Sequence, residues 1–223
     1  MSDDRPGGIP RRLGQIVVIN GAPRSGKSSI AAAIQEEFDG PWINLGVDHY
    51  MQMTPKRYLP GIGLRPGGER PDLEATVELF YGGLYESIAA HSRLGLNVVA
   101  DVGHHDAYSR PYAILSRCAR RLRGLPVLFV GLRCPREIIN RRRSDTGYRT
   151  LETTPGGSAD PIELWQRAVH VPGIYDLELD TSVLSARECA EQIRQRLANG
   201  PPATAFEALA RASQGPEPRG ASE

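Results

Sequence analysis

Residues 21–28 have the types and spacing that bind the phosphate groups of a nucleotide. They fit the pattern G-x-x-x-x-G-K-[ST], in which Lys27 would reach the β- and γ-phosphates. The Ser28 hydroxyl would ligate Mg²⁺. We expect a continuous set of residues to bind the nucleotide: Gly21, Ala22, Pro23, Arg24, Ser25, Gly26, Lys27, Ser28 and Ser29.

The flanking segments have the character that such a loop needs. The apolar run 16–19 predicts a strand before the loop, and the run 29–34 predicts a helix after it. The first N–H groups and the positive end of the helix dipole would then face the phosphates. Gly21 and Gly26 permit backbone angles and a close approach that a Cβ would block. Because a glycine-rich turn carrying Lys-Ser by chance would lack this setting, the sequence predicts binding of ATP with Mg²⁺.

Two acidic residues are expected at the ends of the second and third strands. Asp48 follows a strand predicted over residues 42–47, and Asp101 ends the apolar strand 97–102. Phosphoryl transfer needs an acid on the metal side and an acid that accepts the proton of the attacking hydroxyl. An apolar strand that ends in Asp favours Asp101 as the metal-side acid. For Asp48, catalysis and the capping of a following helix are equally good interpretations at this point.

Arginines and histidines add further candidates. The segment 133–149 is rich in arginine, whose guanidinium groups match phosphate geometry. With the glycines of residues 146–159, it predicts a closing lid at about residues 141–160. A solvated helix face accounts for most of these arginines equally well. His104 and His105 would either line an acceptor pocket or lie in a solvated loop.

The order of apolar and helical runs predicts the fold class. Strands are expected at residues 15–20, 42–47, 97–102, 126–132 and 174–179. Helices are expected at residues 27–38, 72–94, 109–122, from Pro135 and at 185–197. This alternation predicts an α/β fold, a P-loop kinase-like parallel five-stranded sheet with helices on both faces and an arginine-containing lid.

Composition and charge limit the classes of function. The 223 residues include 27 basic and 26 acidic side chains, which argues against a general binder of nucleic acid. Three cysteines without metal-ligand spacing indicate reduced thiols in a cytoplasmic protein. There is no apolar run long enough to span a membrane, so we expect no membrane partner. The sequence leaves a homo-oligomer open.

The two ends of the sequence differ from its middle. We expect a flexible N-terminus over residues 1–14, a P-loop kinase domain over 15–199 and a flexible C-terminal tail over 200–223. Within that tail, residues 205–212 have the pattern of one short helix.

Several of these segments together resemble the chloramphenicol phosphotransferase-like proteins, over about residues 16–197. The segments that carry the resemblance are Ile19-Asn20-Gly21, Pro41-Trp42, Gly46-Val47-Asp48, Val130-Gly131-Leu132-Arg133-Cys134 and the stretch 170–181 with His170, Gly173, Tyr175-Asp176 and Asp180-Thr181. The resemblance implies an ATP-dependent kinase that acts on a small-molecule hydroxyl, with Asp48 as general base. It also implies that Arg141 and Arg143, within a residue or two, steady the transferred phosphoryl group.

The acceptor is left open. Residues 49–70 should frame its pocket, and they show little similarity to the antibiotic kinase. Antibiotic resistance is therefore one role among several, and chloramphenicol itself is not the predicted substrate. The alternatives are a nucleotide, nucleoside or sugar kinase of the same fold, or a non-catalytic ATP-binding regulatory module. A signalling GTPase is disfavoured because the chain lacks Asn-Lys-x-Asp, and Val102-Gly103-His104 follows Asp101.

Overall fold

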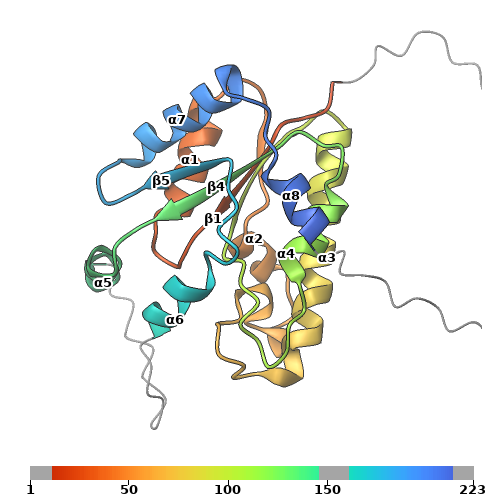
Figure 1. The fold of residues 1–223 in the computed structure, drawn as a ribbon, viewed down its shortest axis with the longest axis vertical. Coiled ribbons are helices and arrows are strands. Elements are labelled where there is room, and N and C mark those ends of the chain that lie inside the picture. Colours follow the sequence, from red (N-terminus) through yellow and green to blue (C-terminus); the bar gives the residue numbers. More distant parts are fainter. Residues whose placement is uncertain (1–11, 146–160, 213–223) are drawn as a thin grey trace, which may run out of the picture.

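A parallel sheet with helices on both faces forms the centre of the molecule (Figure 1). The computed structural model describes residues 12–145 and 161–212. The strands are β1 Ile16–Asn20, β2 Trp42–Asn44, β3 Asn97–Val102, β4 Val127–Arg133 and β5 Leu177–Asp180. The α-helices are α1 Lys27–Glu37, α2 Val47–Gln52, α3 Pro71–Arg93, α4 Ile114–Arg121, α5 Arg136–Asp145, α6 Pro161–Ala168, α7 Ala186–Asn199 and α8 Ala205–Ala212, with 3₁₀ helices η1 Lys56–Tyr58 and η2 Gly61–Gly63.

The five strands lie in the order β2-β3-β1-β4-β5, and every adjacent pair is parallel. The predicted fold class is thus confirmed. Because β1 is central, the segment that leaves its carboxyl end lies between the ends of β3 and β4. Ile19 pairs with Asp101 of β3 and Val130 of β4, so side chains from all three strands reach one edge of the sheet.

Alternate residues of the strands supply two separate cores. Ile16 and Val18 of β1 face the core built with α3, α4 and α8. Val17 and Ile19 face the opposite core, built with α1 and α7. This alternation follows from the two-residue period of a strand, and both faces are apolar because helices cover both. The three cysteines are buried and free, in agreement with the expected reduced thiols.

Some boundaries differ from the sequence-based expectation. Strand β2 ends at Asn44 rather than at residue 47, because the Asn44 side chain accepts a hydrogen bond from the Gly46 N–H and turns the chain. The helix expected from residue 109 begins at Ile114. Its start is delayed because the Asp106 carboxylate accepts the N–H groups of Tyr112 and Ala113, and Ala113 has a left-handed backbone with φ 51°.

The chain after residue 200 contributes more to the core than its composition suggests. Residues 205–212 form the expected short helix α8, and the side chains of its residues Phe206 and Leu209 are buried. Phe206 meets the ring of Phe129 edge to face, at 5.0 Å between centroids. The carboxylate of Asp176 accepts hydrogen bonds from the N–H groups of Thr204 and Ala205 at the start of α8. The described part of the tail is therefore fixed to the sheet.

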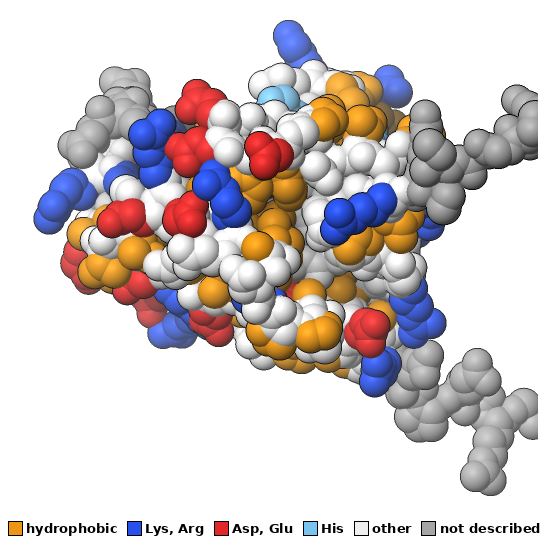
Figure 2. All heavy atoms as spheres, turned by 90° about the horizontal axis from the view of Figure 1, so that it is seen from above, with side chains coloured by type: hydrophobic (Ala, Val, Ile, Leu, Met, Phe, Trp, Pro, Cys, Tyr) orange, Lys and Arg blue, Asp and Glu red, His pale blue; other side chains and the backbone are white. Residues whose placement is uncertain are grey.

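Charged and apolar side chains are mixed on the face of the molecule shown in Figure 2, with basic and acidic groups interspersed. Within the described residues, the helices are all too short or too polar to cross a membrane.

Replacing Phe206 with Ala should destabilise the protein through α8. Removing a buried aromatic ring leaves a cavity, so we expect the free energy of unfolding to fall by about 3 kcal/mol. Glu207→Ala is the matched control on the same helix, because the Glu207 side chain is exposed and pairs with Arg211 at the surface. That variant should stay within about 0.5 kcal/mol of the parent. Urea unfolding measures both, and equal stability of the two variants would show that α8 is not part of the cooperative core.

Candidate active site

The loop between β1 and α1 has the backbone of an anion cradle. Arg24 and Gly26 have left-handed φ angles of 66° and 98°, and Gly26 begins α1 without a side-chain cap. Successive N–H groups in such a conformation converge on one point. A Cβ on Gly21 would lie 2.8 Å from the Ser25 Oγ and 3.1 Å from Leu132, so only glycine fits there. The backbone of residues 21–28 is therefore compatible with the predicted binding of phosphate. We call them the phosphate-binding loop.

Lys27 lies across this loop. Its Nζ donates hydrogen bonds to the carbonyl oxygens of Gly21 and Ala22, both at 2.9 Å. Burial lowers the pKa of Lys27 to about 8, against the opposing effect of the Asp101 and Asp48 carboxylates, which raise it. Two acidic groups from different elements therefore act on the same ammonium group.

Ser28 and Asp101 are in direct contact. The Ser28 hydroxyl donates to Asp101 Oδ2 at 2.7 Å, although the two residues are 73 positions apart. Asp101 is 5% exposed and precedes the last residue of β3. A hydroxyl and a carboxylate are oxygen donors of the kind that Mg²⁺ prefers, so the predicted metal-binding pair is compatible with that ion.

Gly46 makes room for this carboxylate. A Cβ at residue 46 would lie 1.6 Å from Asp101 Oδ1, which means that the carboxylate rests on the bare Cα. Sequence reasoning marked Gly46 only as part of a motif. The steric role of Gly46 can be recognised only from its contact with Asp101, which is 55 positions away in the sequence.

Asp48 lies one element later than expected. It is in the first turn of α2, whose N-cap is Gly46, and its side chain is exposed. The prediction that it follows a strand directly is wrong, because the chain turns into α2 after Asn44. An acidic residue in the first turn of a helix is stabilised by the dipole, but Asp48 is not the residue that caps this helix.

Of the arginines in α5, Arg142 contacts the phosphate-binding loop. Its guanidinium donates to the carbonyl oxygens of Thr181 at 2.6 Å and Arg24 at 3.3 Å. The neighbouring Arg141 is exposed and Arg143 is half-buried. The family resemblance implied Arg141 and Arg143 within a residue or two, and Arg142 lies within that range. Residues 146–160 of the expected lid lie outside the described residues.

Thr181 fixes the loop from the side of β5. Its hydroxyl donates to the Ser25 carbonyl oxygen at 2.8 Å, and its N–H donates to the Arg133 carbonyl oxygen. The hydroxyl of Thr181 in the Asp-Thr element thus supports the phosphate-binding loop by a hydrogen bond to the backbone of that loop. Sequence reasoning noted this element in the resemblance but assigned it no structural role.

The histidine pair is buried, which excludes the solvated-loop interpretation. His104 Nε2 is 2.8 Å from the Tyr85 hydroxyl, and the ring stacks on Tyr81. His105 Nε2 donates to the Leu64 carbonyl oxygen at 2.9 Å. Burial lowers the pKa of His104 to about 3 and also lowers that of His105, so both rings are neutral. Within the described residues, no group of three acidic, His or Cys side chains could hold a metal ion.

Asn20 ties the start of the loop to two other segments, the connection between α6 and β5 and the residues after β3. Its amide nitrogen donates to the Val169 carbonyl oxygen at 2.8 Å and the Tyr175 hydroxyl at 2.9 Å, and its amide oxygen accepts the His104 N–H. Asn20 is fully buried. The ring of Tyr175 in turn fits against Gly131, where a Cβ would lie 2.7 Å from it.

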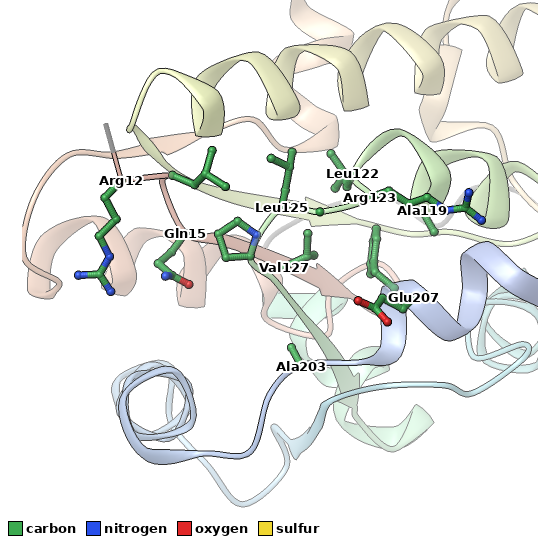
Figure 3. A pocket seen from close by; sticks show the side chains of 13 residues that line it. Arg12, Gln15, Ala119, Leu122, Arg123, Leu125, Val127, Ala203 and Glu207 are labelled. Atoms are coloured by element: carbon green, nitrogen blue, oxygen red, sulfur yellow. The ribbon is translucent and has the colours of Figure 1, made fainter. Parts of the chain in front are cut away.

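Two hollows lie at the opposite edge of the sheet. The larger, of about 500 Å³, is lined by residues that precede β1 and β4, by the end of α4 and by α8, among them Gln15, Leu125 and Glu207 (Figure 3). The smaller, of about 320 Å³, shares Arg12, Leu13 and Gln15 with it. Since the phosphate-binding loop follows the carboxyl end of β1, neither hollow is part of the candidate active site.

The sheet order and the loop after β1 define a P-loop fold of the kinase type, and solved kinases share it. The Mycobacterium tuberculosis APS kinase, solved with AMPPNP and APS, has a TM-score of 0.57 at 18% identity, covering 83% of this chain and 98% of the kinase. Acinetobacter baumannii shikimate kinase has a TM-score of 0.54 at 13% identity, covering 82% and 93%. The Deinococcus radiodurans tunicamycin resistance protein has a TM-score of 0.56 at 19% identity, covering 83% and 96%.

Sequence comparison identifies the family. Residues 14–198 match the family described as chloramphenicol phosphotransferase-like protein. A Mycobacterium tuberculosis protein provisionally named an O-phosphotransferase is 28% identical over 219 residues, which cover 91% of this chain and 89% of the relative. The chain belongs to the chloramphenicol phosphotransferase-like proteins, so it is a phosphotransferase of the kinase type.

Gly46→Ala should displace the Asp101 carboxylate and lower phosphotransferase activity. A displacement of about 1 Å at a reacting centre reduces rate on the order of a hundredfold. The φ of −74° at Gly46 suits alanine, so the effect should arise from the clash with Asp101 rather than from backbone strain.

The matched control for this variant is Gly124→Ala. Gly124 has φ 74°, but an added Cβ there would meet no atom within 4 Å. It should lose roughly 1 kcal/mol of stability and keep its activity. Steady-state assays and urea unfolding of both variants measure the contrast. Full activity of Gly46→Ala would contradict the assigned fit between Gly46 and Asp101.

Proposed function

We propose that the protein transfers the γ-phosphoryl group of ATP to a hydroxyl group of a small molecule. The observation that carries this proposal is the hydrogen bond from Ser28 to Asp101, 2.7 Å long, at the end of a loop crossed by Lys27. This hydrogen bond places the Ser28 hydroxyl and the Asp101 carboxylate together beside the backbone N–H groups of the phosphate-binding loop. Phosphoryl transfer requires these parts for positioning and for neutralising charge.

The residues of the loop divide the work of holding the nucleotide. The N–H groups of the phosphate-binding loop and Lys27 would bind the phosphates, and Ser28 with Asp101 would hold Mg²⁺. The bound ion would neutralise charge on the phosphate oxygens. The family match and the P-loop fold support this assignment.

Asp48 is the proposed general base. The family resemblance supports this role, and so does the charge of Asp48, which acts on Lys27 and raises the pKa of its ammonium group. As the acceptor oxygen bonds to phosphorus, its proton passes to the Asp48 carboxylate and the β,γ-bridging oxygen leaves with ADP. A positioned base contributes about a hundred- to ten-thousandfold to such a step.

Arginine would stabilise the transferred group. The resemblance assigns this role to Arg141 and Arg143, and the contacts of Arg142 with Arg24 and Thr181 make it a third candidate. The proposed acceptor is a hydroxyl because the Mycobacterium tuberculosis relative is named an O-phosphotransferase. The fold alone is shared with APS kinase and shikimate kinase, so a nucleotide or sugar kinase remains the alternative.

Asp48→Asn should slow transfer and leave nucleotide binding intact. The amide keeps the shape of the carboxylate and removes its basicity, so we expect kcat to fall by at least about a hundredfold. The acceptor is first found by an ATP-consumption screen over hydroxylated compounds, including phenicols, nucleosides and amino sugars. The Kd for Mg²⁺·AMPPNP is then measured by calorimetry.

Two further variants separate the roles. Asp101→Asn should weaken the binding of Mg²⁺ and so raise the Mg²⁺ concentration that activity requires, and Lys27→Ala should lower turnover by orders of magnitude. A wild-type rate in Asp48→Asn would mean that its carboxylate only stabilises α2. If no compound in a broad screen accepts phosphate while Mg²⁺·AMPPNP binds, the protein is a nucleotide-binding regulatory module instead.

The lowered pKa of Lys27 makes nucleotide binding depend on pH. Below pH 8 the ammonium group is charged in the free protein, and binding takes up no proton there. Above pH 8 it is neutral, and the phosphates must restore its charge, so affinity should fall by up to about tenfold per pH unit. Calorimetry at pH 9 in buffers of different ionisation enthalpy should detect proton uptake. Lys27→Arg stays charged and should show no such uptake.

A further inference from the structure

A third apolar cluster, separate from the two cores, joins α5 and α6 to the phosphate-binding loop. Its buried members are Ala22, Cys134, Ile139, Ile162, Trp165 and Val169. Trp165, on α6, has the largest side chain among them and is 8% exposed. The neighbouring Gln166 donates to the Cys134 carbonyl oxygen at 2.8 Å and holds α6 against the end of β4. The loop is thus packed against α6 through Ala22.

The indole of Trp165 also contacts the segment after β3. A Cβ on Gly103 would lie 3.2 Å from Cζ3 of the indole and 3.6 Å from the Gly21 carbonyl oxygen. The bare Cα of Gly103 is therefore enclosed between the indole and the first residue of the phosphate-binding loop. The indole is thus linked to the phosphate-binding loop through Gly103.

On its other side the indole meets His105. The two rings are edge to face, with 5.1 Å between their centroids. The imidazole Nε2 donates to the carbonyl oxygen of Leu64, the residue that follows η2. Helix η2 contacts α2. At this contact a Cβ on Gly63 of η2 would lie 2.6 Å from the sulfur of Met51 of α2. Since α2 carries Asp48, these contacts lead to the side from which the acceptor would approach.

We propose that Trp165 is a positioning residue that sets His105 and Leu64 relative to the phosphate-binding loop and thereby orients the acceptor. This inference rests on the proposed function. The physical basis is close packing: a buried ring that touches both sides cannot be shortened without leaving a gap between them. It also follows that nucleotide bound in the loop changes the surroundings of the indole.

The first test uses the fluorescence of Trp165 itself. The chain has two tryptophans, and the other one, Trp42, is the first residue of β2 at the opposite edge of the sheet. Trp42→Phe leaves Trp165 as the sole indole. We expect Mg²⁺·AMPPNP to shift its emission in a saturable way, with a midpoint equal to the calorimetric Kd. As a matched control, Trp165→Phe, which keeps only Trp42, should show no shift.

The second test is kinetic and separates acceptor from nucleotide. Trp165→Leu keeps an apolar side chain but loses the ring, and it should raise the acceptor KM at least about tenfold while the ATP KM changes less than about threefold. Trp165→Phe restores a ring and should keep the acceptor KM within about threefold of wild type. Equal changes in both KM values would indicate a purely structural role and overturn the proposal.

The outcomes also distinguish this inference from the proposed function. If AMPPNP binds by calorimetry and the emission of Trp165 does not respond, the positioning role is wrong and the phosphotransferase assignment stands. If calorimetry detects no AMPPNP binding to the wild-type protein, both proposals are overturned.

Discussion

The arrangement of the site depends on how the Asp101 carboxylate is held. One oxygen accepts the Ser28 hydroxyl, and the other rests on the bare Cα of Gly46. This requires β3 to lie between β1, which leads into the phosphate-binding loop, and β2, which leads to Gly46. A strand order without β3 between β1 and β2 would separate these two contacts of the Asp101 carboxylate. Both Asp101 of β3 and Asp48 of α2 act electrostatically on Lys27.

Local patterns predicted the parts of the site that depend on short segments. The apolar strand, the two glycines and the following helix identified the phosphate-binding loop, since each signal lies within about a dozen residues. Asp101 was predicted because an apolar strand ends beside it. Asp48 was recognised as a candidate through family resemblance, but its place in α2 was missed. The side-chain turn of Asn44 that ends β2 leaves no periodic signal.

Features that depend on distant contacts could not be predicted. The contact of Arg142 with the loop depends on where α5 starts and on Thr181, which is 39 positions away. The burial of α8 depends on Asp176 and Phe129, whereas the Ala, Gly and Pro content nearby indicates a loose tail. The histidine pair lies beneath α3 and α6, and no local signal distinguishes that from a polar loop.

The support of the loop by late segments bears on how the chain acquires its activity during synthesis. Ser25 is held by Thr181, which follows it by 156 residues, and Asn20 is held by Val169 and Tyr175, about as far away. Contacts of such long separation form late, because much chain must be ordered before they repay the loss of entropy. A ribosome must therefore release most of the polypeptide before the phosphate-binding loop is fixed. Nascent fragments that contain all of residues 21–28 would lack the hydrogen bonds with Thr181, Val169 and Tyr175 that support the shape of the loop.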